Sequence, residues 1–109
     1  MTKADSKDRL CGMLGLAMRA GKVVIGTEMV CNSLAKAGRV RLVLVASDAS
    51  ESTKKKIRTK CEFYGVRKEE LPLDTGEIGK LLGKTYGPAA VAVADEGFAR
   101  EIARLVTLN

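Results

Sequence analysis

The sequence contains no histidine and no tryptophan, and its three cysteines lie far apart, without a CxxC pair. Structural zinc sites are built from closely spaced cysteines and histidines, so we expect no metal site. A catalytic cysteine needs a neighbouring base to form its thiolate, and no histidine is present to serve. An odd number of cysteines at apolar positions, namely Cys11, Cys31 and Cys61, is typical of buried free thiols in a reducing compartment. We therefore expect no cofactor.

Long hydrophobic runs are missing as well. No stretch approaches the roughly 20 apolar residues that a membrane span needs. The first residues, Met-Thr-Lys-Ala-Asp-Ser-Lys-Asp-Arg, lack the apolar core of a signal peptide. The sequence therefore predicts a cytoplasmic protein without a membrane partner.

Positive charge is present in excess. The chain has 19 lysines and arginines against 13 acidic residues, a net charge of +6, and the excess lies in its first two-thirds. Such a balance favours an anionic partner. Because the excess of positive charge lies outside the C-terminal helix, we expect this helix to face away from that partner. The basic run over residues 54–60 is by itself typical of a solvated helix face. With 46% hydrophobic residues in 109, the chain is long enough for one core, which predicts a single domain over residues 1–109.

Helical and strand-like patterns alternate along the whole chain. Helices are predicted over residues 5–20, 27–37, 51–64 and 75–82 and after Asp95, with strands over 23–25, 41–46, 66–73 and 89–94. The nearly continuous apolar runs at 41–46 and 89–94 indicate central strands covered on both faces, whereas the charged segment 66–73 suits only an edge strand. The pattern predicts an α/β fold, a three-layer α/β/α sandwich with a mixed sheet of about four strands.

Spacing also predicts which side chains are buried. In the helix over 27–37, Val30, Leu34 and Ala37 fall on one face, which we expect to be apolar and inward. Three aromatic residues, Phe63, Tyr64 and Phe98, stand at core spacing and are interpreted as packing residues.

The segment from Gly26 to Glu28 is the first candidate site. Gly26 has no Cβ, so another molecule can approach its backbone closely. We expect Thr27 to cap the free amides of the following helix and Glu28 to lie in its first turn, where the helix dipole favours a carboxylate. Cations surround this acid along the sequence. Because cations hold phosphates and a carboxylate accepts from base amino groups, the pattern favours nucleic-acid recognition.

A second candidate lies in the loop over residues 84–88. Tyr86 precedes a buried strand and has glycine and proline after it, so its ring can stack on an unpaired base. The same apolar loop also suits a protein-interaction module, in which it docks a partner protein and the basic charge is incidental.

An enzymatic reading is the least favoured alternative. Asp48 and Asp95 each follow an apolar strand and precede a helix, where two carboxylates can bind magnesium, but we favour helix caps for both. The Gly-Lys-Thr ending at Thr85 is preceded by a glycine spacing one residue too short for a phosphate-binding loop. The sequence therefore predicts a protein that is not an enzyme.

Four segments in order resemble the kink-turn RNA-binding ribosomal-protein superfamily, in particular its bacterial YlxQ-like branch. They span residues 21–28, 42–50, 77–84 and 90–93, and the resemblance covers about residues 8–105. It implies an α/β/α sandwich that recognises a sharply bent RNA with tandem sheared G·A pairs through the motif Gly-x-Asn-Glu-x-x-x-Lys. Gly26 and Glu28 match residues of this motif with one residue fewer between them, Thr27 stands where asparagine is usual, and Cys31 or a neighbour stands where lysine is usual.

The resemblance also implies the remaining contacts. The family's second contact loop covers a flipped-out base and corresponds to residues 85–89. Lys22 and Lys80 are expected at phosphates. The implied RNA-binding residues are Lys22, Gly26, Thr27, Glu28, Cys31, Ser50, Lys80, Tyr86, Gly87 and Pro88. We accordingly expect a monomeric RNA-binding protein related to ribosomal proteins and translation, with structured RNA and the ribosome as candidate partners.

Overall fold

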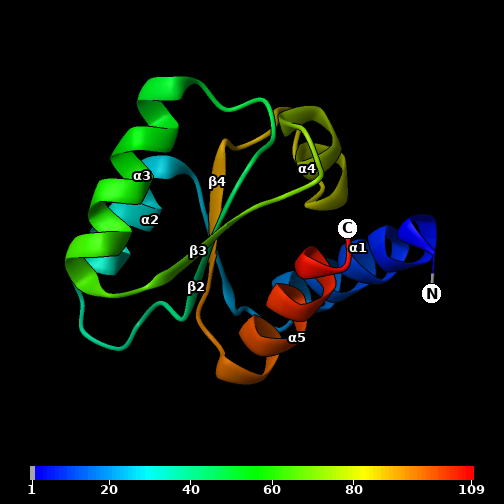
Figure 1. Ribbon diagram of the computed structural model, residues 1–109, viewed down its shortest axis with the longest axis horizontal. Helices are drawn as coiled ribbons and strands as arrows, with labels where there is room; N and C mark the ends of the chain where they lie inside the picture. The colour runs from blue at the N-terminus through cyan, green and yellow to red at the C-terminus, as the bar shows by residue number, and fades with distance from the viewer. Residues whose placement is uncertain (1) are drawn as a thin grey trace.

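The computed structural model describes residues 2–109, in which helices and strands alternate as predicted. The elements are α1 (Lys3–Arg19), β1 (Val23–Ile25), α2 (Thr27–Leu34), β2 (Leu42–Val45), α3 (Glu51–Tyr64), β3 (Arg67–Glu70), α4 (Thr75–Leu81), β4 (Ala90–Val93) and α5 (Glu96–Thr107). Figure 1 shows three layers, with α2 and α3 on one face of the sheet and α1, α4 and α5 on the other. The predicted α/β/α sandwich is confirmed.

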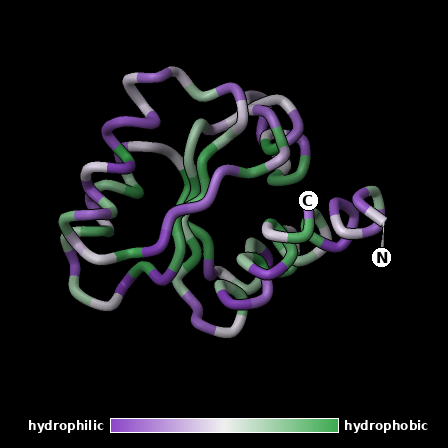
Figure 2. Tube along the Cα trace, viewed as in Figure 1, coloured by the Kyte–Doolittle hydropathy of each residue, from purple (hydrophilic) through white to green (hydrophobic). Residues whose placement is uncertain are grey.

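The sheet is mixed and has the strand order β1-β4-β2-β3. β4 is antiparallel to both of its neighbours, while β2 and β3 are parallel. Every residue of β2 and β4 is buried, which confirms these two apolar runs as the central strands. β3 has the sequence Arg-Lys-Glu-Glu and lies at the edge, and Figure 2 shows it as a hydrophilic segment beside the hydrophobic strands.

Because of this topology, the loops gather at two opposite ends of the sheet. β1, β2 and β3 finish, and β4 begins, at one end, which we call the carboxyl end. β1, β2 and β3 begin, and β4 finishes, at the other, which we call the amino end. The amino end lies along the lower edge of Figure 1. Loops that are far apart in sequence are thereby brought together at each end.

The core lies on both faces of the sheet. From α1 it receives Leu10, Leu14 and Ala17, at the helical spacing that the sequence predicts. From α5 it receives Ile102 and Leu105, and the predicted packing residue Phe98 is partly buried against it. None of the helices in residues 2–109 is long and apolar enough to cross a membrane.

The predicted helix over residues 27–37 is too long. α2 ends at Leu34, and Ala37 is exposed rather than on the buried face. The chain leaves the helix early because it must turn back to enter β2. Val40, in the turn-back segment, is buried instead.

The prediction that Phe63 and Tyr64 pack in the core is wrong. Phe63 is 80% exposed and Tyr64 is 39% exposed. The inward stripe of α3 consists of Ile57 and Cys61, and a residue two positions after Cys61 is rotated by about 200° to the opposite face. Tyr64 has the right spacing, but it is the last residue of α3. The two rings pack against each other edge to face, with their centroids 4.8 Å apart.

Candidate nucleic-acid interface

The start of α2 lies at the carboxyl end of the sheet and has an unusual cap. Gly26 is the N-cap, with φ 98° and ψ 145°, and its N–H donates to the Ala90 carbonyl at 2.9 Å. Such a φ is accessible to glycine and strained for other residues. Thr27 is already the first helical residue, so the prediction that Thr27 caps the helix is wrong: a capping side chain must belong to the residue before it.

The first amides of α2 therefore have no side-chain acceptor. The other helices in residues 2–109 each have a capping side chain, from Thr2, Ser50, Asp74 and Asp95 respectively. Glu28 follows in the first turn of α2, is exposed, and forms no ion pair with any other described residue. Donor amides and an unpaired carboxylate thus face solvent side by side.

The loop before β4 reaches the same end of the sheet, because Ala90 pairs with Val45 and receives the hydrogen bond from Gly26. Tyr86 in this loop is 77% exposed, so its ring is accessible to a stacking partner. Pro88 is buried, and its contact with an extruded base stays a prediction.

Gly87 holds the loop in place. A Cβ at this position would overlap the backbone carbonyl of Thr75 at the start of α4. One turn later in α4, a Cβ on Gly79 would lie 2.9 Å from the Tyr86 carbonyl oxygen. α4 and the loop are therefore in backbone contact, which only glycine permits. Sequence reasoning missed Thr75 and Gly79; the small residues of α4 at helical spacing are the pattern that points to them.

Asp48 joins a third loop to this arrangement. Its carboxylate accepts hydrogen bonds from the Thr75 backbone N–H at 2.9 Å and from the Thr75 hydroxyl at 3.0 Å. The prediction that Asp48 caps the helix following it is wrong. Ser50 caps that helix, accepting from the Thr53 N–H at 3.2 Å, and Asp48 instead stabilises the start of α4. The contact from Asp48 through Thr75 to Gly87 fixes the loop that carries Tyr86.

Two predicted contact residues do not lie at this surface. Cys31 is only 8% exposed and packs in the core, and its RNA contact stays a prediction. Lys22 lies at the amino end, where its carbonyl accepts from the Ala94 N–H at 2.8 Å. At about 3.3 Å per strand residue, Lys22 stands about 13 Å from Gly26. Lys80 is exposed on α4 directly after Gly79. The structure therefore gathers Gly26, Thr27, Glu28, Ser50, Lys80 and Tyr86 at the carboxyl end.

Residues 8–103 match the Ribosomal protein L7Ae/L30e/S12e/Gadd45 family. The chain belongs to this family. It is 41% identical over 97 residues to the RNA-binding protein YlxQ of Bacillus subtilis, covering 86% of this chain and 91% of that protein. It is 36% identical over 102 residues to the RNA-binding protein YlxQ of Enterococcus faecium, covering 93% and 94%.

A solved structure shows the same L7Ae-type fold. It is a protein of unknown function from Bacillus halodurans, with a TM-score of 0.83 and 34% sequence identity, and the match covers 90% of this chain and 96% of that one. The relatives that the chain matches are named as RNA-binding or ribosomal proteins rather than enzymes, and this L7Ae-family chain is not an enzyme. The resemblance found in the sequence is thereby confirmed at the level of the family.

The fold separately overturns the alternative of a magnesium site shared by Asp48 and Asp95. Asp48 follows β2 at the carboxyl end, whereas Asp95 follows the antiparallel strand β4 at the amino end. Asp95 caps α5, accepting from the Phe98 N–H at 2.9 Å, as predicted. Across the described part of the chain, no three Asp, Glu, Cys or His side chains are grouped to hold a metal ion.

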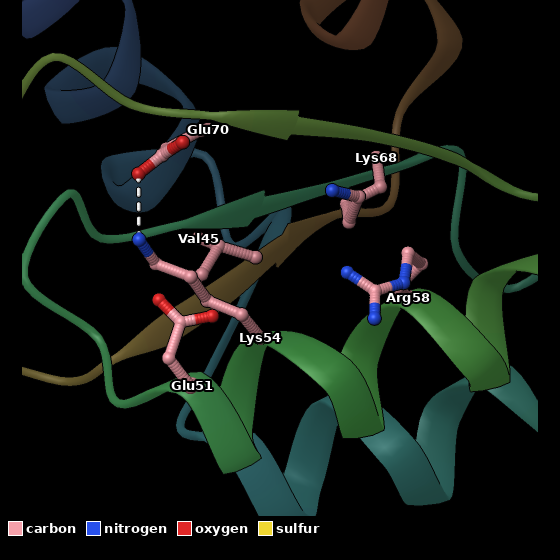
Figure 3. Close-up of a pocket in the computed structure, with 6 residues that line it drawn as sticks. All are labelled: Val45, Glu51, Lys54, Arg58, Lys68 and Glu70. Atoms are coloured by element: carbon pink, nitrogen blue, oxygen red, sulfur yellow. Dashed lines mark hydrogen bonds and ion pairs between the residues drawn. The ribbon is translucent and has the colours of Figure 1, made fainter.

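Near the carboxyl end, a pocket lies between α3 and β3, and it is lined by three cations and two carboxylates, namely Lys54, Arg58, Lys68, Glu51 and Glu70 (Figure 3). The Lys54 ammonium donates to Glu70 at 3.0 Å and to the Ser47 carbonyl at 3.3 Å, and the hydrogen bond to Glu70 raises the pKa of Lys54. Arg58 and Lys68 project into the same pocket and form no ion pair within residues 2–109. Positive charge thus continues along α3 from the carboxyl end.

Proposed function

We propose that this protein binds a folded, sharply bent RNA of the kink-turn kind through the carboxyl end of its sheet. The family and the relatives named as RNA-binding proteins support RNA as the ligand class. The observation that carries the proposal is the uncapped start of α2, with Glu28 in its first turn, at the same sheet end as the exposed ring of Tyr86.

Each group at this end matches one part of such an RNA. The free amides of α2 donate to phosphate or base oxygens, and Gly26 allows the RNA backbone to come close. The Glu28 carboxylate accepts hydrogen bonds from base amino groups exposed at the bend. Tyr86 stacks on a base that the bend has extruded. Ser50 and Lys80 lie at the margin, where a hydroxyl and an ammonium bind phosphate oxygens.

Two departures from the family motif weaken individual contacts. Thr27 presents one hydroxyl where asparagine presents an amide, which has both donors and an acceptor. The buried thiol of Cys31 cannot replace the charge of a lysine. The unpaired cations Arg58 and Lys68 beside α3 supply phosphate contacts in its place. We expect the protein to act as a monomer in the cytoplasm, with ribosomal RNA as the first candidate.

A binding comparison tests this function. The pure protein is titrated with a kink-turn RNA and with a plain duplex of equal length, at low and near-physiological salt. We expect a preference for the bent RNA that survives the higher salt, because base and stacking contacts are less salt-sensitive than phosphate contacts. Equal binding to both RNAs, lost together as salt rises, would contradict the proposal.

Variants localise the site. Glu28→Ala should weaken binding to the bent RNA about tenfold or more, because one good contact to base edges contributes about 1–3 kcal/mol. The matched control is Glu62→Ala. Like Glu28, Glu62 is exposed and has no ion pair within residues 2–109, but it lies in the last turn of α3, away from the start of α2. Equal affinities for the two variants would exclude the start of α2 as the binding site.

One observation favours docking of a protein instead. Met29 is 57% exposed, so two large apolar side chains, Met29 and Tyr86, face solvent at the carboxyl end. A partner protein docked on them would bind with little salt dependence, whereas RNA affinity falls steeply as salt rises. Salt-insensitive association with a purified partner, together with no RNA preference, would establish this second function.

A further inference from the structure

The amino end of the sheet carries a row of cations from three strands. Lys22 directly precedes β1, Arg41 directly precedes β2, and Arg67 opens β3. The register places them at the same level of the sheet. Lys22 and Arg41 flank the end of β4, because the Lys22 carbonyl accepts from the Ala94 N–H and the Arg41 N–H donates to the Val93 carbonyl, each at 2.8 Å. Arg67 pairs with Leu42, the residue after Arg41. With about 4.8 Å between strands, the row spans about 14 Å.

The turn between α2 and β2 adds two more cations, Lys36 and Arg39, at the same end. All five side chains are exposed. In the described part of the chain only Arg67 has an acidic partner, Glu69 at 3.1 Å. Elsewhere, Lys7, Arg100 and Arg104 are paired with carboxylates, while further unpaired cations lie on α1, α3 and α4. Within residues 2–109, the amino end thus presents four cations without an acidic partner.

The exposed aromatic pair lies at this end as well, since α3 finishes there. Tyr64 lines a hollow of about 370 Å³ together with Lys36 and Val40. On the other face of the sheet, Arg41 and Arg67 line a second hollow of about 230 Å³. Cations thus border the beginning of β2 on both sides, and an edge-to-face pair of aromatic rings stands beside them.

We propose that the amino end is a second RNA-binding surface, one that takes single-stranded RNA. Cations bind phosphates of any nucleic acid, but exposed rings gain stacking energy only from bases that are not already paired and stacked. A duplex exposes no such base faces, and an acidic peptide has no base that could stack on Phe63. This surface lies at the opposite end of the sheet from Glu28 and Tyr86. One protein molecule can therefore bind two RNA segments at the same time.

The first test uses a labelled oligouridylate of twelve nucleotides, which cannot form a kink-turn. The double variant Arg39→Ala/Arg41→Ala should lower its affinity about tenfold or more. It should also reduce the slope of log affinity against log salt by about 1.4, at about 0.7 per phosphate contact. The control Lys55→Ala/Lys56→Ala removes the same charge from the exposed side of α3. An equal loss in both variants would overturn the proposal in favour of diffuse charge.

The two surfaces are separated by the same probe. Tyr86→Ala should weaken binding to the kink-turn RNA, and it should lower oligouridylate affinity less than Arg39→Ala/Arg41→Ala does. If Tyr86→Ala lowered oligouridylate affinity as much as Arg39→Ala/Arg41→Ala, both RNAs would bind at the carboxyl end and the second surface would be overturned. Loss of neither would contradict the proposed function at Tyr86 but leave the amino-end proposal standing.

Tyrosine fluorescence tests the stacking directly. The chain has no tryptophan and two tyrosines, so Tyr86→Phe leaves Tyr64 as the only strong fluorophore. Saturating oligouridylate should quench this emission, and a twelve-residue polyaspartate peptide should not. Binding without quenching, or equal competition by polyaspartate, would show a surface for acidic chains in general and would overturn single-stranded RNA as its ligand.

Discussion

Gly87 and Thr75 are in backbone contact, so close that a side chain at position 87 would overlap the Thr75 carbonyl group. Thr75 is in turn held by two hydrogen bonds to the Asp48 carboxylate. These two contacts set the position of the loop that presents Tyr86. The carboxyl end therefore presents its aromatic ring from a fixed support, even though the ring itself is exposed.

Gly87→Ala should destabilise the protein by about 1–3 kcal/mol or more, because an extra methyl group in a tightly packed place forces the backbone apart. Thermal unfolding measures the effect. The control is Gly12→Ala, where a Cβ meets nothing within 4 Å and alanine favours the helix, so that variant should unfold at the same or a higher temperature. Unchanged stability of Gly87→Ala would mean that loop and helix do not pack as described.

Asp48→Ala should lower the free energy of unfolding by about 1–2 kcal/mol, since it removes the acceptor of two hydrogen bonds at the start of α4. Urea titration measures this, and Glu62→Ala serves as the exposed-acid control. Asp48→Ala should also weaken binding to the kink-turn RNA, because it loosens the support of Tyr86. An RNA affinity equal to that of the parent protein would show that the loop does not depend on Asp48.

Acid should weaken the contact between α1 and α4. The Asp74 backbone N–H, and then the Lys7 ammonium at 3.0 Å, hold the pKa of Glu77 below its usual range. A carboxyl group with a lowered pKa in the folded state contributes stability above its unfolded pKa of about 4.3, and loses it as the pH falls through the lower, folded pKa. Between pH 6 and pH 3 the difference in unfolding temperature between the parent protein and Glu77→Gln should shrink. A constant difference would contradict this assignment.

Burial should protect Cys61 from alkylation. Desolvation raises the pKa of its thiol to about 11, so little thiolate exists at pH 8, and the side chain is covered. With iodoacetamide at pH 8, the partly exposed Cys11 should be modified first, and mass spectrometry locates the label. In 6 M guanidinium all three cysteines should react at similar rates. Labelling of native Cys61 as fast as Cys11 would contradict its burial.

Much of the fold follows from local patterns in the sequence. The apolar runs of β2 and β4 have no polar face, so they can lie only in the middle of the sheet. Charge confines β3 to the edge, and Asp95 has the position and the side chain of a helix cap. The positions of Gly26 and Glu28 at a helix start were predicted for the same reason, because the preferences of a glycine and an acid there depend only on adjacent residues.

Other features depend on tertiary contacts, which local sequence patterns do not specify. Helical spacing places Tyr64 inward, yet α3 ends there. Cys31 and Pro88 matched contact positions, but packing buried both.

Local sequence patterns are sufficient to predict the alternation of helices and strands, the central strands, the excess of positive charge and the residues that begin α2. Which loops meet depends on the arrangement of the strands in space. Because β4 runs antiparallel to β2, Asp48 and Asp95 lie at opposite ends of the sheet. The same strand directions gather Glu28 and Tyr86 at one end and Lys22 and Arg41 at the other, since register and direction arise from hydrogen bonds between distant segments.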